Sequence, residues 1–85
     1  MKQFEYTIVD PNGIHARPAG TLAAKIQEFE SAVSLSCGDR RADGKKLIAI
    51  MKMRVKKGEK LTITAEGPDE DVAIEAVKEF ISANL

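Results

Sequence analysis

Residues 32–42, AVSLSCGDRRA, decide the fold class of this chain. Val33, Leu35 and Cys37 alternate with alanine and serine, and this period of two predicts a strand with one apolar and one polar face. Gly38-Asp39 then predicts a tight turn into a second strand. A hairpin with a single apolar face needs covering on one side only, which is typical of antiparallel sheets.

Two further segments, one on each side of this hairpin, alternate in the same way. Their apolar positions are Phe4, Tyr6 and Ile8 in the first segment and Leu61, Ile63 and Ala65 in the second. We therefore expect four antiparallel strands that share one apolar face. The other face is predicted to meet water and carries Thr7, Ser34, Ser36, Thr62 and Thr64.

Three segments are predicted to be helical, although the period alone leaves one of them ambiguous. Within residues 16–29, an amphipathic stripe at i, i+3, i+4 and i+7 is formed by Ala19, Leu22, Ala23 and Ile26. The C-terminal segment begins at Asp69, a good N-cap residue. An apolar stripe follows to the C-terminus, made by Ala73, Val77 and Phe80 with Ile74 and Ile81 beside them. Residues 47–51, LIAIM, fit a helix or a strand.

The predicted order is strand, helix, strand, strand, short helix, strand, helix. Because every strand has one polar face, the helices are expected to pack on the other face only. The predicted fold class is α+β, with a four-stranded antiparallel sheet and three helices on one side of it. The 85 residues have room for one core, so we expect a single domain over residues 1–85.

Composition excludes several classes of protein. The 13 basic and 13 acidic residues cancel, whereas a nucleic-acid module usually carries a basic excess. Cys37 is the only cysteine, so no internal disulfide or cysteine-cluster metal site is possible. No apolar run is long enough to span a membrane or to form the core of a signal peptide. We expect a cytoplasmic monomer that binds no metal, cofactor, nucleic acid or membrane.

The candidate catalytic residues lie within residues 13–18, GIHARP, between a turn and the first predicted helix. The neutral imidazole of His15, the only histidine, is a nucleophile that can attack phosphorus. The first N–H groups of a helix are unpaired and attract anions. Arg17 adds a permanent charge with several donors suited to phosphate oxygens. The segment therefore predicts a phosphoryl-transfer site, against the alternative of an inert surface histidine.

Residues 11–19, PNGIHARPA, closely resemble the active-site signature of HPr, the histidine-containing phosphocarriers of the bacterial sugar phosphotransferase system. The resemblance extends over the whole chain and includes the turn at Lys57-Gly58 and residues 63–67, ITAEG. It implies an open-faced β-sandwich with the order βαββαβα. It also implies that residues 47–53 form the short second helix of that family.

The resemblance implies a carrier that is consumed and regenerated as a co-substrate and is not itself an enzyme. Enzyme I, charged by phosphoenolpyruvate, would phosphorylate His15 on Nδ1, the pros nitrogen. The A components of sugar-specific enzymes II would then accept the group. The predicted phosphate-binding residues are Ala16, Arg17 and Pro18, at the helix start, and Arg17 is also assigned a catalytic role.

A docking surface for these partners is implied on the first two helices. An apolar patch beside a charged site is usual at a transient interface. Ile50 is expected to belong to the core instead. The matching positions of the docking surface are Gly20, Thr21, Leu47, Ile48 and Met51.

Two positions depart from the family pattern. Many family members from Gram-positive bacteria have a serine at position 46 that a dedicated kinase phosphorylates, but this chain has Lys46, which has no hydroxyl, so that regulatory site is expected to be absent. Arg54 stands where the family often has glycine, which leaves the choice of partner open. The basic residues around these positions are expected to speed encounter with an acidic partner.

Two alternatives to sugar transport remain. The chain could be an HPr-like regulatory protein whose phosphorylation controls another protein outside sugar transport. It could also be a plain binding module in which His15 is inert. Transfer of phosphate to a purified A component would distinguish the carrier from the regulator, and phosphorylation by enzyme I would exclude the inert module.

Overall fold

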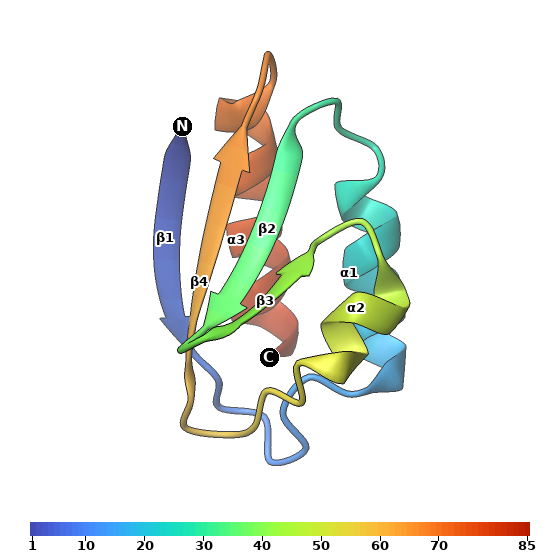
Figure 1. The fold of residues 1–85 in the computed structure, drawn as a ribbon, viewed down its shortest axis with the longest axis vertical. Coiled ribbons are helices and arrows are strands. Elements are labelled where there is room, and N and C mark those ends of the chain that lie inside the picture. The colour runs from blue at the N-terminus through green and yellow to red at the C-terminus, as the bar shows by residue number, and fades with distance from the viewer.

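A computed structural model describes all of residues 1–85. It has seven elements in the predicted order (Figure 1). The bounds of these elements are β1 Lys2–Thr7, α1 Ala16–Ile26, β2 Ala32–Cys37, β3 Arg40–Asp43, α2 Leu47–Lys52, β4 Lys60–Glu66 and α3 Glu70–Asn84. No helix has the length and apolar content that crossing a bilayer requires.

The four strands form one antiparallel sheet in the order β1-β4-β2-β3. Its register aligns apolar residues across all four strands in a single row, made by Phe4, Ile63, Leu35 and Ala42. Ile63 and Leu35 are fully buried, and burying a side chain of this size stabilises the fold by about 1.5–3 kcal/mol. The neighbouring row, Gln3, Thr64, Ser34 and Asp43, belongs to the other face. The predicted hairpin and the predicted one-sided sheet are therefore confirmed.

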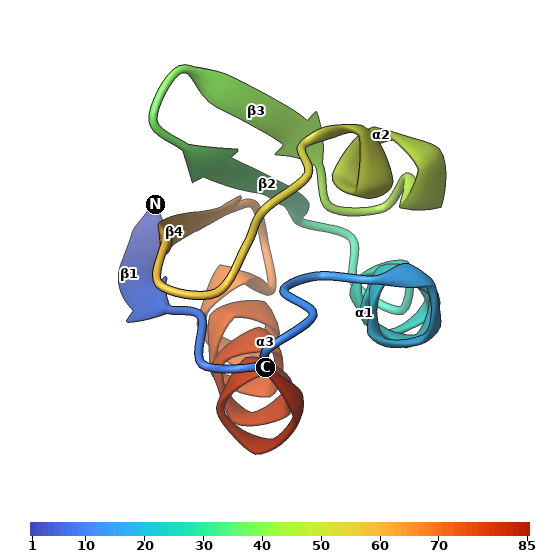
Figure 2. The same cartoon turned by 90° about the horizontal axis from the view of Figure 1, so that it is seen from below.

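All three helices cover the apolar face of this sheet. Seen end-on, α1 and α3 lie side by side beneath the sheet, and α2 lies beside its β3 edge (Figure 2). Two helices insert apolar side chains into the core along their predicted stripes, namely Ala19, Leu22, Ala23 and Ile26 from α1 and Ala73, Ile74, Val77 and Ile81 from α3. The short helix α2 contributes Ile50, which is fully buried as predicted.

The predicted first helix is shorter than its sequence pattern suggests. The α-helix ends at Ile26 and not at Phe29. The N–H groups of Glu28 and Phe29 bond to carbonyls three residues back, those of Lys25 and Ile26. This tighter winding is common in the last turn of a helix and leads the chain into β2.

Asp69 occupies the N-cap position of α3, as predicted, but its side chain does not cap the helix. Its carboxylate accepts hydrogen bonds from Glu30 N (3.0 Å), Ser31 N (2.9 Å) and Ser31 Oγ. These bonds lower the pKa of the Asp69 carboxyl, with the Ser31 hydroxyl as the largest cause. The carboxylate therefore joins the loop after α1 to the start of α3, at the end of the molecule opposite the loop between β1 and α1 (Figure 1).

The start of α2 is also held without a side-chain cap. Lys46 is the N-cap residue, and it makes no capping bond. The turn before it is closed by Asp43, whose Oδ1 accepts from Lys45 N (2.9 Å) and whose carbonyl accepts from Lys46 N (3.0 Å). Asp43 therefore fixes the entry into α2 from outside the helix.

Arg54 is the one residue other than glycine with a positive φ, 51°. This left-handed conformation costs a residue with a side chain about 1–2 kcal/mol. We expect Arg54→Gly to raise the free energy of unfolding by about 0.5–1 kcal/mol, because glycine removes this cost but gains unfolded-state entropy. Urea denaturation measures the change. Lys52→Gly, at the last residue of α2, is the matched control and should not raise the free energy of unfolding, because Lys52 has no positive φ for glycine to relieve. A lower free energy of unfolding in Arg54→Gly would show that the backbone at Arg54 is not strained.

Candidate functional site

His15 lies between the turn after β1 and the first turn of α1. It is the N-cap residue of α1, its backbone is extended (φ −110°, ψ −179°), and its side chain makes no capping bond. The imidazole is 42% exposed, so it is open to a partner. The preceding residue, Ile14, is buried and donates its N–H to Val55 O (3.0 Å). The His15 side chain is thus exposed to solvent, while the backbone next to it is held by the hydrogen bond between Ile14 and Val55.

Asp10 is a second charged group of the site, and the sequence motif around His15 did not predict it. Its Oδ1 accepts from Asn12 N (2.8 Å), and its Oδ2 lies 3.7 Å from Nε2 of His15. The first contact is the local turn that aspartate typically makes ahead of Pro-Asn-Gly. The sequence carries a signal for this turn but none for the second oxygen. A carboxylate at this distance attracts a proton or positive charge on Nε2 and leaves Nδ1 on the other side of the ring.

The start of α1 provides donors beside the imidazole. Ala19 is the first residue of α1 whose N–H makes a hydrogen bond within the protein, to His15 O (3.0 Å). No side chain caps the helix. The N–H groups of Ala16 and Arg17 remain available for an anion. Pro18 has no N–H and cannot donate a hydrogen bond to phosphate. What remains of its predicted contribution is its ring at the site and its fixed φ, which favours the start of the helix.

A shallow depression of about 270 Å³ surrounds the imidazole. Its residues come from the turn after β1, from the first turns of α1 and from the last turns of α3: Asp10, His15, Arg17, Pro18, Thr21, Phe80 and Asn84. No carboxylate of the chain lies within ion-pair distance of Arg17, so its guanidinium is free to bind an anion. Phe80 and Asn84 had no sequence signal for this role, because they reach the site only through helix packing.

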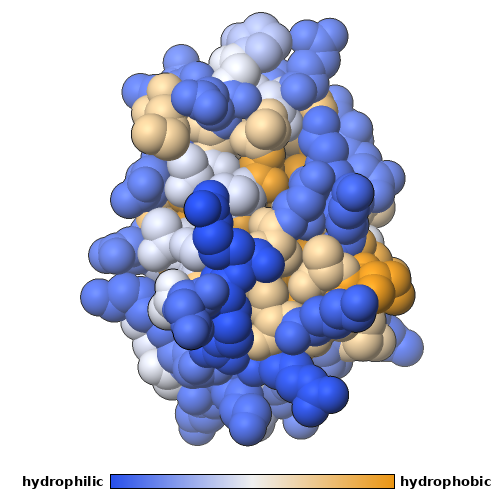
Figure 3. All heavy atoms as spheres, viewed as in Figure 1, coloured by the Kyte–Doolittle hydropathy of each residue, from blue (hydrophilic) through white to orange (hydrophobic).

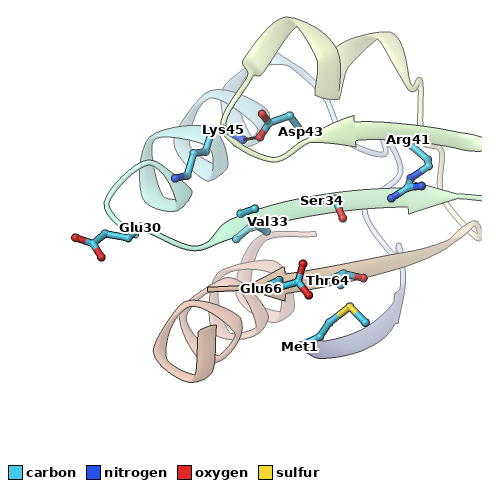
Figure 4. A pocket seen from close by; sticks show the side chains of 10 residues that line it. Met1, Glu30, Val33, Ser34, Arg41, Asp43, Lys45, Thr64 and Glu66 are labelled. Atoms are coloured by element: carbon cyan, nitrogen blue, oxygen red, sulfur yellow. Dashed lines mark hydrogen bonds between the residues drawn. The ribbon is translucent and has the colours of Figure 1, made fainter. Parts of the chain in front are cut away.

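A larger hollow of about 440 Å³ lies on the open face of the sheet (Figure 4). The side chains of Ser34 and Thr64 line its floor, which β2 and β4 form (Figure 4). Charges of both signs surround it, from Glu30, Arg41, Asp43, Lys45 and Glu66. This hollow contains no nucleophilic imidazole, whereas the smaller depression contains the only histidine of the chain beside Arg17. The depression at His15 is therefore the candidate site.

The side chains of the predicted docking surface on α2 are exposed. Leu47 is 36% exposed, Ile48 63% and Met51 38%. In Figure 3 a hydrophobic patch stands at the right-hand edge, where Figure 1 has α2. On the adjoining helix α1, Thr21 is exposed and Gly20 half-buried. The five residues thus lie at or near the surface of two helices that pack together, which leaves them available to a partner.

Comparison with known proteins extends over almost the whole chain. A family model described as the PTS HPr component phosphorylation site matches residues 2–83. The phosphocarrier protein HPr of Lysinibacillus sphaericus is 39% identical over 82 residues, covering 96% of this chain and 93% of that protein. DhaM of Providencia stuartii, the phosphoryl donor subunit of a PEP-dependent dihydroxyacetone kinase, is 35% identical over 81 residues, covering 95% of this chain but 17% of that protein.

A solved structure shares the fold as well. The histidine-containing phosphocarrier protein of Mycoplasma superposes with a TM-score of 0.95 at 34% identity, covering 96% of this chain and 93% of that one. The predicted open-faced β-sandwich is therefore confirmed, with α2 in place of the ambiguous segment. The match over residues 2–83 and the likeness in sequence and fold show that the chain belongs to the HPr family of phosphocarrier proteins of the phosphotransferase system.

Proposed function

We propose that this chain accepts a phosphoryl group from enzyme I on Nδ1 of His15 and donates it to the A components of sugar-specific enzymes II. The observation that carries the proposal is the placement of His15 between the Asp10 carboxylate, 3.7 Å from Nε2, and the uncapped start of α1. A nucleophile, an orienting carboxylate and an anion-binding helix end meet at one exposed point. Membership of the family supports the assignment of the partners.

The transfer step follows from the two ring nitrogens. Asp10 favours the tautomer with a proton on Nε2, so Nδ1 keeps its lone pair. That lone pair forms a bond to phosphorus while the bond between phosphorus and the donor's leaving atom breaks, and the electron pair of the broken bond stays with the donor. The proton remains on Nε2, where the carboxylate balances the positive charge of the ring. Onward transfer reverses these changes and returns the lone pair to Nδ1.

Charge on the phosphoryl oxygens is balanced by groups of α1. The N–H groups of Ala16 and Arg17 and the guanidinium of Arg17 are the donors near the imidazole. Donors that are already in place stabilise the transition state without reorganising during the step. The carrier leaves each exchange as a phosphorylated or dephosphorylated co-substrate, so we assign it no enzymatic activity of its own.

The partners are proposed to dock on the apolar patch of Leu47, Ile48 and Met51 together with Gly20 and Thr21. Exposed basic residues flank this patch, including Lys46, Lys52 and Arg54. Basic residues around an apolar centre steer an acidic partner and raise the association rate more than the affinity. Position 46 offers no hydroxyl, so we expect no regulatory phosphorylation there.

Incubation with phosphoenolpyruvate and a purified enzyme I tests the proposal. Intact-protein mass spectrometry at alkaline pH should show the gain of one phosphoryl group, which brief acid treatment removes. A chain that gains no mass in the presence of active, phosphorylated enzyme I would overturn the carrier function and favour the inert binding module.

A second candidate acceptor is supported by the relative from Providencia stuartii. That relative is named as the phosphoryl donor subunit of a dihydroxyacetone kinase, and this chain matches a segment of it. The chain could therefore donate phosphate outside sugar transport. To decide between them, the phosphorylated chain is mixed separately with a purified A component and with purified subunits of such a kinase. The phosphoryl group moves to the true acceptor.

Arg17→Ala is expected to slow phosphorylation by roughly 10²–10³-fold, because it removes a positive charge that faces the transferred group. Arg17 is exposed and makes no ion pair, so stability should change by no more than about 0.5 kcal/mol. Quenched-flow mass spectrometry measures the rate. Arg17→Lys is the matched variant and should recover part of the rate by keeping the charge without the planar guanidinium. An unchanged rate in Arg17→Ala would remove Arg17 from the site.

A further inference from the structure

Arg40, at the start of β3, holds together two segments that are distant in sequence. Its Nη1 donates to Met53 O (2.8 Å) and to Arg54 O (3.3 Å), and its Nη2 bonds to the carboxylate of Glu59. The same guanidinium faces its own hairpin, where Nε donates to Cys37 O (3.3 Å) and Nη2 to Cys37 Sγ (3.1 Å). One side chain therefore links the β2–β3 turn to the segment that joins α2 to β4.

Glu59 completes the attachment at the other end of that segment. Its second oxygen, Oε1, accepts from Lys56 N (2.8 Å) while Oε2 holds Arg40. These bonds lower the pKa of the Glu59 carboxyl, with the Arg40 side chain as the largest cause. Arg40 and Glu59 thus fix residues 53–59 from both ends, and we call these two residues the Arg40–Glu59 clamp.

Residues 53–59 are in turn the support on which the histidine turn rests. Val55 O accepts from Ile14 N (3.0 Å), next to His15. Gly58 N donates to Ile8 O (2.8 Å), and Ile8 N donates to Glu59 O (3.0 Å). The loop after β1 and the segment before β4 lie side by side at the same end of the molecule in both ribbon views (Figures 1 and 2).

The contact between the two segments is too close to tolerate a shift. A Cβ added at Gly13 would lie 2.2 Å from Val55 O and 2.8 Å from Lys56 Cα. Backbone therefore packs directly on backbone, and a displacement of residues 53–59 moves the turn that carries His15. Arg40 itself does not line the depression around the imidazole.

We propose that the Arg40–Glu59 clamp positions His15 for phosphoryl transfer, by holding residues 53–59 in the place that sets the backbone of Ile14. The clamp is a positioning device, and the inference rests on the proposed function. Because misplacing a reacting group by about an ångström can cost up to roughly 10²-fold in rate, loss of the clamp is expected to lower the turnover of the chain by enzyme I rather than its binding.

The kinetic test compares Arg40→Ala with wild type as substrates of enzyme I, at a temperature where circular dichroism shows both to be folded. We expect kcat to fall by about tenfold or more while KM stays within about twofold. The conservative variant Arg40→Lys should recover part of kcat. The double variant Arg40→Ala/Glu59→Ala should cost no more than the more harmful single one, because the two residues act as one unit. A rise in KM alone would overturn the proposal and make Arg40 a contact of the partner.

Asp69→Asn is the matched control for a general loss of stability. It weakens the contact between Asp69 and Ser31, at the end of the molecule opposite the loop between β1 and α1 (Figure 1), and it should leave kcat unchanged. An equal fall of kcat in Asp69→Asn and Arg40→Ala would show that stability alone controls the rate and would overturn the positioning role.

A second measurement needs no transfer and separates this inference from the proposed function. In the free protein, NMR chemical shifts of the His15 ring should change in Arg40→Ala and not in Asp69→Asn. Unchanged His15 shifts in Arg40→Ala would overturn the clamp even if the chain is a carrier. If enzyme I fails to phosphorylate wild type, the proposed function fails, and the shifts still decide whether the clamp sets the geometry of His15.

Discussion

His15→Ala is expected to abolish phosphorylation by enzyme I and to leave the fold unchanged. His15 is the only histidine of the chain, so no other imidazole can replace it. The side chain is 42% exposed and makes no capping bond. The free energy of unfolding should therefore change by no more than about 0.5 kcal/mol. Loss of the phosphoryl group with retention of stability separates a chemical role of the imidazole from a structural one.

Mass spectrometry after incubation with phosphoenolpyruvate and enzyme I measures this loss, and urea denaturation measures the stability. Ser34→Ala is the control, because its hydroxyl lies on the open face of the sheet, away from the depression. This control should gain one phosphoryl group, as wild type does. Acid-labile phosphate that persists in His15→Ala would refute the assignment of the nucleophile.

Gly13→Ala is expected to lower the free energy of unfolding by about 3 kcal/mol. Gly13 has a φ of +64°, which costs alanine about 1–2 kcal/mol. Its new Cβ would also lie 2.2 Å from Val55 O, and a carbonyl in the backbone cannot move aside as a flexible side chain can. The strain should push the histidine turn away from residues 53–59 and lower the rate of phosphorylation as well.

Gly38→Ala separates the two causes of this loss. Gly38 has nearly the same φ, +63°, but nothing lies within 4 Å of the position of its Cβ. It should therefore lose only about 1–2 kcal/mol from the backbone conformation, and its phosphorylation rate should equal that of wild type. Denaturation curves of the two variants give the comparison. Equal losses at both positions would show that Gly13 and Val55 do not pack tightly.

The strands could be predicted because their signal is local. Alternation in residues 32–37 fixes which face is buried, and the apolar row that includes Leu35 and Ile63 follows from it. The end of α1 could not be predicted, because the apolar pattern continues to Phe29, whereas the N–H groups of Glu28 and Phe29 bond to carbonyls three residues back instead of four. Residues 47–52 needed the family resemblance, since a short apolar run has no decisive period.

The candidate site was predictable where its parts are neighbours in sequence. His15 and Arg17 belong to one motif, whereas Phe80 and Asn84 come from the last turns of α3 and reach the depression only in the folded chain. Asp69 does not make the expected capping bond, because its carboxylate accepts hydrogen bonds from the loop at Ser31 instead. No local sequence pattern indicates this contact. The positive φ of Arg54 could not be predicted from arginine itself, which does not normally adopt it. The glycine that the family often has at this position is the signal that would have indicated it.

The pairing of β1 with β4 has a consequence for the newly made chain. Phe4 pairs with Ile63, and the turn that presents His15 rests on Val55. A ribosome releases the N-terminal strand and the histidine early, but their support emerges only after the middle of the chain has been made. Contacts of such long separation close slowly, since the entropy of the intervening loop is lost before they form. A nascent or truncated chain that ends before β4 therefore exposes the histidine motif without the geometry of the site.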